Sequence, residues 1–464
     1  MKTRLLLIAL AMGASQLYAQ TPDGGISPEM LGEIRKAQPS AQQTRALRNA
    51  MAGTSLKTLA TVANNPDAAD TYFSNTVPSK GITDQQSSGR CWLFTGYNVI
   101  RAKLIKKYGL GDFQFSQAYG FFYDQLEKSN LFLQVMIDNA KKPKDDKLVE
   151  WLFKNPISDG GTFCGVQDVT EKYGLVPAEV MPETFSSNNT STLASILSQK
   201  LREYGLTLRK AAADGESRKK LMERKKGMLA TVYHILSVSL GEPPTEFTYA
   251  FKAADGTPME AKKYTPMSFY KEHAAMDIDN YALLMNDPSR PYHKTYTIDM
   301  DRHSYDGRQW TYLNLPMEEI KAMAIASIKD SAMMYYSCDV GKFLNSKTGV
   351  LSLQNYDYAS LFNTDFPMDK AERISSFASA SSHAMTLMGV DLDKDGKSKK
   401  WMVENSWGPT YGFKGHLIMT DQWFDEYSFR LVVDKKYVPA KTLELLKQKP
   451  VELPAWDPLF TPEE

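Results

Sequence analysis

Cys91 and Gln85 lie close together in a loop that leads into an apolar, helix-forming run. A thiol in the first turn of a helix is near unpaired backbone N–H groups and the positive end of the helix dipole, and both favour the thiolate. A thiolate attacks carbonyl carbon, while the Gln85 amide and the Cys91 backbone N–H would hold the oxygen that becomes negative in acyl transfer. The segment therefore predicts a nucleophile with its oxyanion hole. The alternative is a buried structural cysteine at a helix start.

A cysteine nucleophile needs a base, and His383 has the sequence setting of one. It begins a mostly apolar run, 382–390, that is typical of a buried strand, and a second strand is predicted over 401–408 after a turn-rich stretch. Two strands joined in this way would bring Asn405 beside His383, where the amide oxygen accepts the imidazole N–H and fixes the ring. Trp407 would shield that hydrogen bond from water.

The chain has six histidines, and the other five lack such a setting. We expect them to be surface or helix residues: His234, His273, His293, His303 and His416. His383 is therefore the predicted base.

The sequence predicts no metal site and no cofactor. The stretch 391–396 resembles the start of a calcium loop, but Met402 occupies the twelfth position, where a bidentate carboxylate is required. A hairpin turn between the strands of His383 and Asn405 is the better interpretation.

The residues around these positions resemble the papain-like cysteine peptidases. Ser88-Gly-Arg-Cys-Trp92 stands in the frame of the signature around the papain nucleophile, with serine in place of the first cysteine. The longer pattern Gln-x-Ser-Ser-Gly-Arg-Cys-Trp is similar to the bleomycin hydrolase and aminopeptidase C branch, and His-Ala-Met-Thr and Glu-Asn-Ser-Trp-Gly also match. The resemblance implies an α+β papain-like fold, with a helical half and a β-barrel-like half. It assigns the catalytic roles to Gln85, Cys91, His383 and Asn405.

The spacing of nucleophile and base indicates an insertion. His383 follows Cys91 by 292 positions, about twice the roughly 130–150 positions of papain-like enzymes. A stretch rich in Leu, Lys, Arg, Glu and Ala at helical spacing, about 191–241, predicts an inserted helical subdomain. We expect one peptidase domain over 81–464 that contains this insertion.

Two further segments are predicted to bind substrate. Gly160 and Gly161 let a peptide backbone approach closely and resemble the family's wall for the substrate main chain, with an ordinary turn as the alternative. The tail, 453–464, matches the family in Leu-Pro-Ala-Trp-Asp-Pro. In that family the C-terminus lies in the cleft, which implies that the carboxylate of Glu464 pairs with the α-amino group of the substrate.

The first residues resemble a secretory signal peptide over 1–19, with a short basic region, an apolar run too short to span a bilayer and a small residue before Gln20. A linker and arm are expected over 20–80. We therefore expect export to the periplasm or outside the cell, without a membrane anchor.

The charge of the chain gives little reason to expect a polyanionic partner. The formal net charge is +1, and the one dense basic run, 218–226, has the pattern of a solvated helix face. Nucleic acid is therefore not expected as a partner.

These residues predict a cysteine peptidase that acts through an acyl-enzyme intermediate, and the resemblance implies an aminopeptidase that removes N-terminal residues from peptides. The resemblance implies broad side-chain tolerance and a homohexamer whose active sites face an internal cavity. A papain-like endopeptidase and a catalytically inactive binding or scaffold homologue are the alternatives.

Overall fold

The computed structural model describes residues 24–68, 70–277 and 280–460. The predicted signal peptide, 1–19, and the predicted substrate-binding residue Glu464 lie outside the described residues. The chain divides into two compact units, Met1–Thr61 and Val62–Glu464, and each is described by itself.

The described part of the first unit contains helices α1 (Pro28–Lys36), α2 (Ala41–Gly53) and α3 (Leu56–Ala60). Ser27 caps α1, because its side-chain oxygen accepts the backbone N–H of Met30 at 3.1 Å. Pro28 fits the first turn, where its missing N–H costs no helical hydrogen bond.

The second unit combines helices with a large sheet. Within the described residues the main sheet has twelve strands, in the order β14-β5-β6-β4-β13-β7-β10-β11-β12-β9-β8, with β1 beside β10. The strand bounds are β1 (Asn75–Thr76), β4 (Tyr281–Met285), β5 (Lys294–Ile298), β6 (Thr311–Asn314), β7 (Met334–Cys338), β8 (Leu344–Asn345), β9 (Val350–Leu351), β10 (His383–Leu392), β11 (Ser398–Glu404), β12 (His416–Thr420), β13 (Ser428–Asp434) and β14 (Val451–Leu453). A separate pair consists of β2 (Phe247–Tyr249) and β3 (Lys262–Tyr264).

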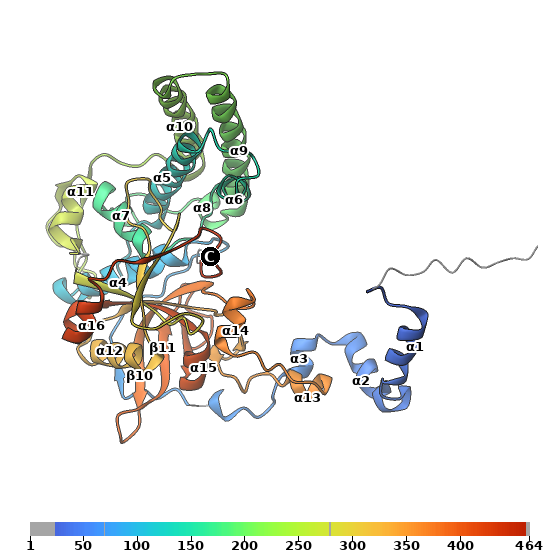
Figure 1. Ribbon diagram of the computed structural model, residues 1–464. Helices are drawn as coiled ribbons and strands as arrows, with labels where there is room; N and C mark the ends of the chain where they lie inside the picture. The colour runs from blue at the N-terminus through green and yellow to red at the C-terminus, as the bar shows by residue number, and fades with distance from the viewer. Residues whose placement is uncertain (1–23, 69, 278–279, 461–464) are drawn as a thin grey trace, which may run out of the picture. The chain divides into compact units, whose positions relative to one another are not determined.

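The helices of this unit confirm the predicted α+β class. Their bounds are α4 (Cys91–Tyr108), α5 (Gln117–Asp138), α6 (Lys147–Lys154), α7 (Phe163–Tyr173), α8 (Phe185–Asn188), α9 (Ser191–Ala213), α10 (Arg218–Leu240), α11 (Pro266–Phe269), α12 (Met317–Lys329), α13 (Tyr358–Phe362), α14 (Lys370–Ser375), α15 (Asp421–Tyr427) and α16 (Ala440–Leu445). In Figure 1, α5, α9 and α10 lie side by side at the top, and β10 and β11 lie below α4. Among the described residues, no helix is both long and apolar enough to cross a membrane.

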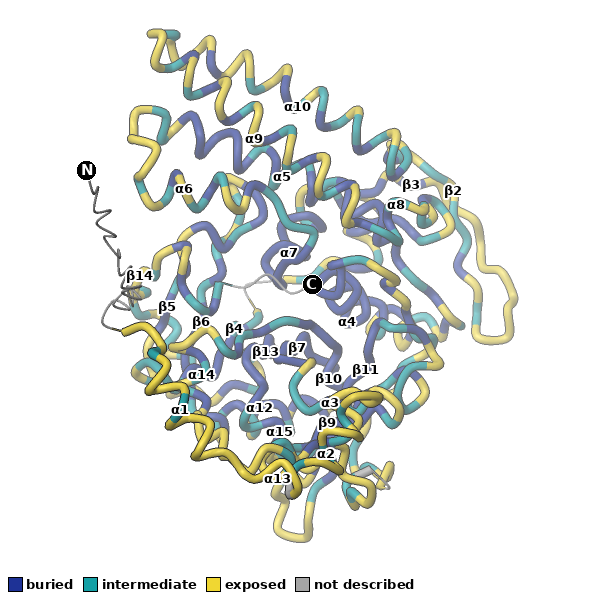
Figure 2. Tube along the Cα trace, turned by 90° about the vertical axis from the view of Figure 1, so that its right-hand side faces the viewer, coloured by how far each residue is buried: buried dark blue, intermediate teal, exposed yellow. Residues whose placement is uncertain are grey.

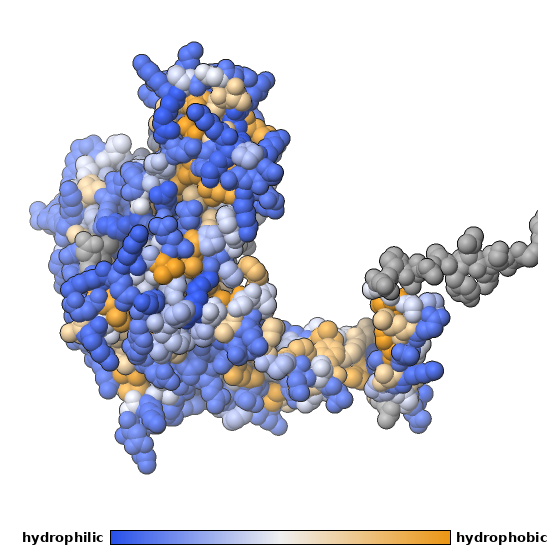
Figure 3. Space-filling view, in the orientation of Figure 1, coloured by the Kyte–Doolittle hydropathy of each residue, from blue (hydrophilic) through white to orange (hydrophobic). Residues whose placement is uncertain are grey.

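Helices α9 and α10 form a hairpin over the stretch in which the sequence predicts a helical insertion. Leucines at helical spacing, such as Leu193, Leu197 and Leu201, are buried, and both helices pack on α5. The outer surface of this bundle is mostly hydrophilic (Figure 3). Within the basic run, Arg218 pairs with Asp138 at 2.8 Å and Arg224 pairs with Glu216 at 2.6 Å, so part of its charge is neutralised locally.

Helix α4 runs through the centre of the second unit. Every residue from Cys91 to Arg101 is buried (Figure 2), because the helix packs against β10 on one side and α7 on another. The helix ends at Gly109, whose φ of 62° is the left-handed conformation that closes helices. The first residue of α4 is therefore held between the helices and the sheet.

A buried ion pair joins α4 to the end of β11. Arg101 Nη2 lies 2.8 Å from Glu404 Oε1, and the two side chains are 3% and 1% exposed. Removing one member of such a pair leaves a buried charge without compensation. The pair therefore couples the helical half to the strand that precedes Asn405.

We expect Arg101→Met to lower the free energy of unfolding by about 3–5 kcal/mol, since it leaves the buried Glu404 carboxylate without its cation. Denaturant unfolding followed by circular dichroism measures the loss. The matched control is Arg224→Met, which removes a solvent-screened surface pair with Glu216 and should cost much less. Equal losses in the two variants would contradict the role given to the buried pair.

Candidate active site

Cys91 and His383 meet where α4 packs on β10, and each is the first residue of its element. The backbone N–H of Ala384, the residue after His383, donates to Cys91 Sγ at 3.4 Å. No acidic residue occupies the first turn of α4. The sulfur therefore lies at the positive end of a helix and beside a backbone donor, and both favour the thiolate.

The hairpin of β10 and β11 brings His383 to Asn405. The strands are antiparallel, with Thr386 opposite Glu404, so the start of β10 lies beside the residue that follows β11. His383 Nε2 lies 2.8 Å from Asn405 Oδ1. An amide oxygen only accepts hydrogen bonds, so Nε2 carries a proton and Nδ1 is the ring nitrogen left to exchange a proton with the thiol.

Trp407 covers this pair. Its ring stacks on the His383 imidazole, with a centroid distance of 4.6 Å and an angle of 28° between the planes. His383 and Asn405 are each 1% exposed. The structure thus brings Trp407 to the position that the shielding prediction requires.

Gln85 is held by the residue that follows Asn405. The Ser406 hydroxyl donates to Gln85 Oε1 at 2.6 Å, and the Gln85 backbone N–H donates to the Ser406 carbonyl at 2.8 Å. With its oxygen engaged in this way, the amide directs Nε2 to the other side, where one N–H reaches the Ser88 carbonyl at 2.6 Å. An amide nitrogen carries two hydrogens, so Nε2 keeps a second donor for an oxyanion.

Sequence reasoning did not identify Ser406 as a site residue. Its hydroxyl fixes which end of the Gln85 amide faces the reaction, and this contact joins residues 321 positions apart. Its place directly after Asn405 is the one signal in the sequence that could have suggested a role.

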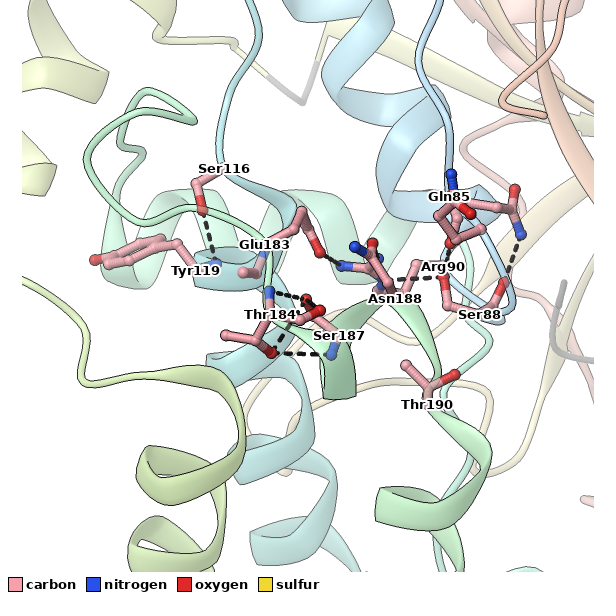
Figure 4. Close-up of polar contacts among 12 residues, drawn as sticks. Gln85, Ser88, Arg90, Ser116, Tyr119, Glu183, Thr184, Ser187, Asn188 and Thr190 are labelled. Atoms are coloured by element: carbon pink, nitrogen blue, oxygen red, sulfur yellow. Dashed lines mark hydrogen bonds and ion pairs between the residues drawn. The ribbon is translucent and has the colours of Figure 1, made fainter. Parts of the chain in front are cut away.

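Arg90 fixes the loop between Gln85 and Cys91 (Figure 4). It is fully buried, its Nη1 pairs with Glu183 Oε2 at 2.7 Å, and its Nε donates to the Ser88 hydroxyl at 3.0 Å. Burial lowers the pKa of Arg90, while the neighbouring Glu183 carboxylate acts in the opposite direction. The other Glu183 oxygen accepts the backbone N–H of Ala118 in α5 at 3.1 Å, so the oxyanion loop is tied to a second helix.

Gly160 and Gly161 border a cavity of about 480 Å³. Much of its lining is apolar and includes Leu131, Phe132, Trp151 and Phe460. The loop that contains Gly160 and Gly161 is hydrogen-bonded to Trp92, the residue after Cys91. The Trp92 indole N–H donates to the Asp159 carbonyl at 3.0 Å. This position suits a wall for the substrate main chain, which stays a prediction.

The tail reaches the same cavity. Strand β14 pairs with β5, and the chain continues to Leu459, whose carbonyl accepts Arg430 Nη2 at 3.1 Å. Phe460 packs on Trp151 with ring centroids 5.2 Å apart. Phe460, the last described residue, therefore lines the same cavity as Gly160 and Gly161.

The expectation that His303 is a surface or helix residue is wrong. The residue is 3% exposed, lies outside the helices and hydrogen-bonds to Asp124 and to the backbone of Thr162. Its partners are 179 and 141 positions away, so local patterning carried no sign of its burial.

We expect Asn405→Ala to reduce kcat/KM roughly 10–100-fold, because the residue orients the imidazole without reacting. Steady-state kinetics with an aminoacyl amide measure the change. Asn405→Asp, which keeps an acceptor for Nε2–H, is the matched control and should lose less. A folded Asn405→Ala variant that is as inactive as Cys91→Ala would contradict the orienting role.

Comparison with known proteins agrees with this geometry. The sequence model of the Peptidase C1-like family matches residues 25–460. Bleomycin hydrolase of Homo sapiens is 39% identical over 403 residues, which covers 84% of this chain and 88% of the relative. Aminopeptidase C of Lactococcus lactis is 36% identical over 419 residues, covering 89% of this chain and 94% of the relative. The crystal structure of PepW from Lactobacillus rhamnosis HN001 superposes with a TM-score of 0.91 at 35% identity, covering 95% of this chain and all of that one.

Proposed function

Because the chain belongs to the Peptidase C1-like family, we propose that it is a cysteine aminopeptidase acting on peptides. The observation that carries the proposal is the junction of α4 and β10, where Cys91 Sγ lies beside the residue after His383 and His383 is bonded to Asn405. Relatives named aminopeptidase C align with most of the chain and support removal of N-terminal residues.

In the first half of the proposed reaction, the Cys91 thiolate attacks the carbonyl carbon of the first peptide bond. The carbonyl oxygen becomes negative and accepts hydrogen bonds from Gln85 Nε2 and the Cys91 backbone N–H. His383 then gives its Nδ1 proton to the leaving amine as the C–N bond breaks, and a thioester remains on Cys91.

In the second half, His383 removes a proton from water, which attacks the thioester carbon. The oxyanion again lies against Gln85 and the Cys91 N–H. The C–S bond breaks, the amino acid leaves, and the thiolate and imidazolium are restored. Asn405 holds the imidazole on Nε2 through both halves.

Selection of the free amino group is assigned to the tail. The chain ends in Phe-Thr-Pro-Glu-Glu, so two acidic side chains and the terminal carboxylate follow Phe460. A carboxylate near the cavity of Gly160 and Gly161 would pair with the substrate's α-ammonium group and occupy the space that a longer N-terminal extension needs.

A comparison of free and N-acetylated peptide substrates tests the proposal on the purified chain that begins near Gln20. Cleavage restricted to unblocked substrates is the expected result. Equal cleavage of both would identify an endopeptidase. No cleavage of either, with Cys91 unreactive toward iodoacetamide, would identify an inactive homologue.

We also propose that the chain is exported and assembles as a homohexamer. The basic and apolar pattern of 1–19 motivates the first proposal, and the resemblance to the bleomycin hydrolase branch motivates the second. Mass spectrometry of the protein from its natural source tests export, and an intact 1–19 segment would refute it. Sedimentation equilibrium of the processed chain tests the hexamer, and a monomeric mass would refute it.

A further inference from the structure

A buried charged cluster that the proposed mechanism leaves unused lies behind the glycine loop. His303 Nδ1 is 2.5 Å from Asp124 Oδ1, and Lys128 Nζ is 2.9 Å from Asp124 Oδ2. The Asp124 side chain is fully buried, and the Lys128 and His303 side chains are 11% and 4% exposed. Burying the charges of Asp124 and Lys128 costs desolvation free energy, which points to a functional role for the cluster.

The hydrogen bonds fix the protonation state of His303. Its Nε2 lies 3.1 Å from the backbone nitrogen of Thr162. A backbone N–H only donates, so Nε2 must accept with its lone pair. The single ring proton is therefore on Nδ1 and is donated to Asp124. The bound imidazole is neutral.

The charges around the ring agree with a neutral state. Burial lowers the pKa of His303, and the positive charge of Lys128 lowers it further. The carboxylates of Asp124 and Asp168 act in the opposite direction, and the net pKa lies below the ordinary value.

The imidazole is built into the glycine loop. A Cβ atom on Gly161 would lie 2.2 Å from the ring, and one on Gly165 would lie 2.1 Å from it, so only glycine leaves room at both positions. The ring also packs on the Trp92 indole, with centroids 4.7 Å apart. His303 thus touches both the loop and the residue that follows the nucleophile.

Lys128 holds the other end of the same loop. Its Nζ donates to the Ser158 carbonyl at 3.0 Å and to the Gly160 carbonyl at 2.5 Å. The Thr162 N–H donates to His303, so the segment 158–162 is held at one end by Lys128 and at the other by His303. Both of these side chains contact Asp124.

We propose that His303 is a positioning residue for substrate binding: its neutral imidazole, held by Asp124, keeps the Gly160–Gly161 wall in place through the Thr162 amide. This inference rests on the proposed peptidase function, in which that wall meets the substrate main chain. Protonation would set a ring N–H against the Thr162 N–H and break their bond. The wall would then loosen, so substrate binding weakens in acid while the chemistry at Cys91 is unaffected.

The test compares His303→Leu, His303→Gln and the control His293→Gln, whose histidine lies on the surface. Leucine offers no acceptor to Thr162, so KM for an aminoacyl amide should rise about tenfold, the effect expected from one lost hydrogen bond to a binding wall. In that variant kcat and the rate of Cys91 alkylation by iodoacetamide should stay within about twofold of wild type. Glutamine can reach Thr162 with its amide oxygen and should recover part of the loss, and His293→Gln should match wild type.

The pH dependence separates positioning from mere stability. In the wild type, KM should rise only at a pH well below the ordinary histidine pKa, because burial and the charge of Lys128 lower the pKa of His303 and the ring takes up its proton there. Neither His303→Leu nor His303→Gln titrates there, so this acid rise should disappear in both. A folded His303→Leu variant with wild-type KM, or an acid rise that persists in His303→Gln, would overturn the inference. If the leucine variant does not fold, the glutamine variant decides.

Failure of the peptidase proposal can be told apart from failure of this inference. A wild-type chain that hydrolyses no peptide defeats the former alone. The role of His303 is then tested by alkylation of Cys91 with leucine chloromethyl ketone. The saturation constant, which is the reagent concentration at half of the maximal alkylation rate, should rise in His303→Leu. An unchanged saturation constant would overturn the inference about His303.

Discussion

Cys91→Ala is expected to lower kcat by at least about 10⁴-fold, because the variant has no sulfur to form the thioester and only binding and the oxyanion donors remain. The fold should persist, since alanine occupies less space at the start of α4. Steady-state hydrolysis and incorporation of iodoacetamide, read by mass spectrometry, measure the two losses.

The matched control is Cys164→Ala, which removes a different buried sulfur. Burial raises the pKa of the Cys164 thiol well above its ordinary value, so this residue is not a nucleophile at neutral pH. The control should keep kcat within about twofold and lose a small amount of stability. Substantial hydrolysis by a folded Cys91→Ala variant would refute the assigned nucleophile.

Removal of residues 461–464 is expected to change specificity more than rate. The truncated chain keeps Leu459 and Phe460, and so keeps their contacts with Arg430 and Trp151. It loses the carboxylates proposed to pair with the substrate's ammonium group. We expect the ratio of N-blocked to free substrate cleavage to rise roughly 30–150-fold, the effect of an ion pair worth about 2–3 kcal/mol.

A variant that changes only charge separates the two proposed roles of the tail, which are pairing with the substrate's ammonium group and occupying the space that a longer substrate needs. Glu463→Gln with Glu464→Gln keeps the length of the chain but leaves only the terminal carboxylate. It should raise KM for free substrates without admitting blocked ones, because the tail still fills its space. A truncated enzyme that is folded and keeps the original ratio would show that the tail does not set specificity.

The parts of the site that the sequence predicts are those with local signals. The start of α4 is marked by the change from a loop rich in Gly and Ser to an apolar run, and its end by Gly109. The hairpin of His383 and Asn405 is marked by two apolar runs around a turn. The insertion is marked by leucines at helical spacing, and α9 and α10 fall within one residue of its predicted limits.

The parts that the sequence does not predict depend on contacts between distant segments. His303 carries no periodic pattern, and its burial depends on Asp124 in α5 and on two glycines in the loop and α7. The pairing of Arg101 with Glu404 likewise joins residues 303 positions apart. Topology creates these contacts, and propensity and spacing act over too short a range to reveal them.

The order of the sheet is unpredictable for the same reason. Strand β7 lies between β13 and β10, although both partners follow it by many residues. A hairpin can be inferred from one turn, but this arrangement needs the whole chain. The resemblance to papain-like peptidases supplied the fold class that the pattern alone could not.

The contact of Gln85 with Ser406 has a consequence for how the protein is made. A chain emerges from its N-terminus, so the segment with the thiol appears long before the strands that supply base and orienting amide. Until residue 406 has emerged, the nascent chain has an unactivated cysteine and cannot digest itself or its neighbours. At roughly 5–20 residues per second, the remaining tail follows within several seconds. The order of synthesis thus delays activation of the nucleophile.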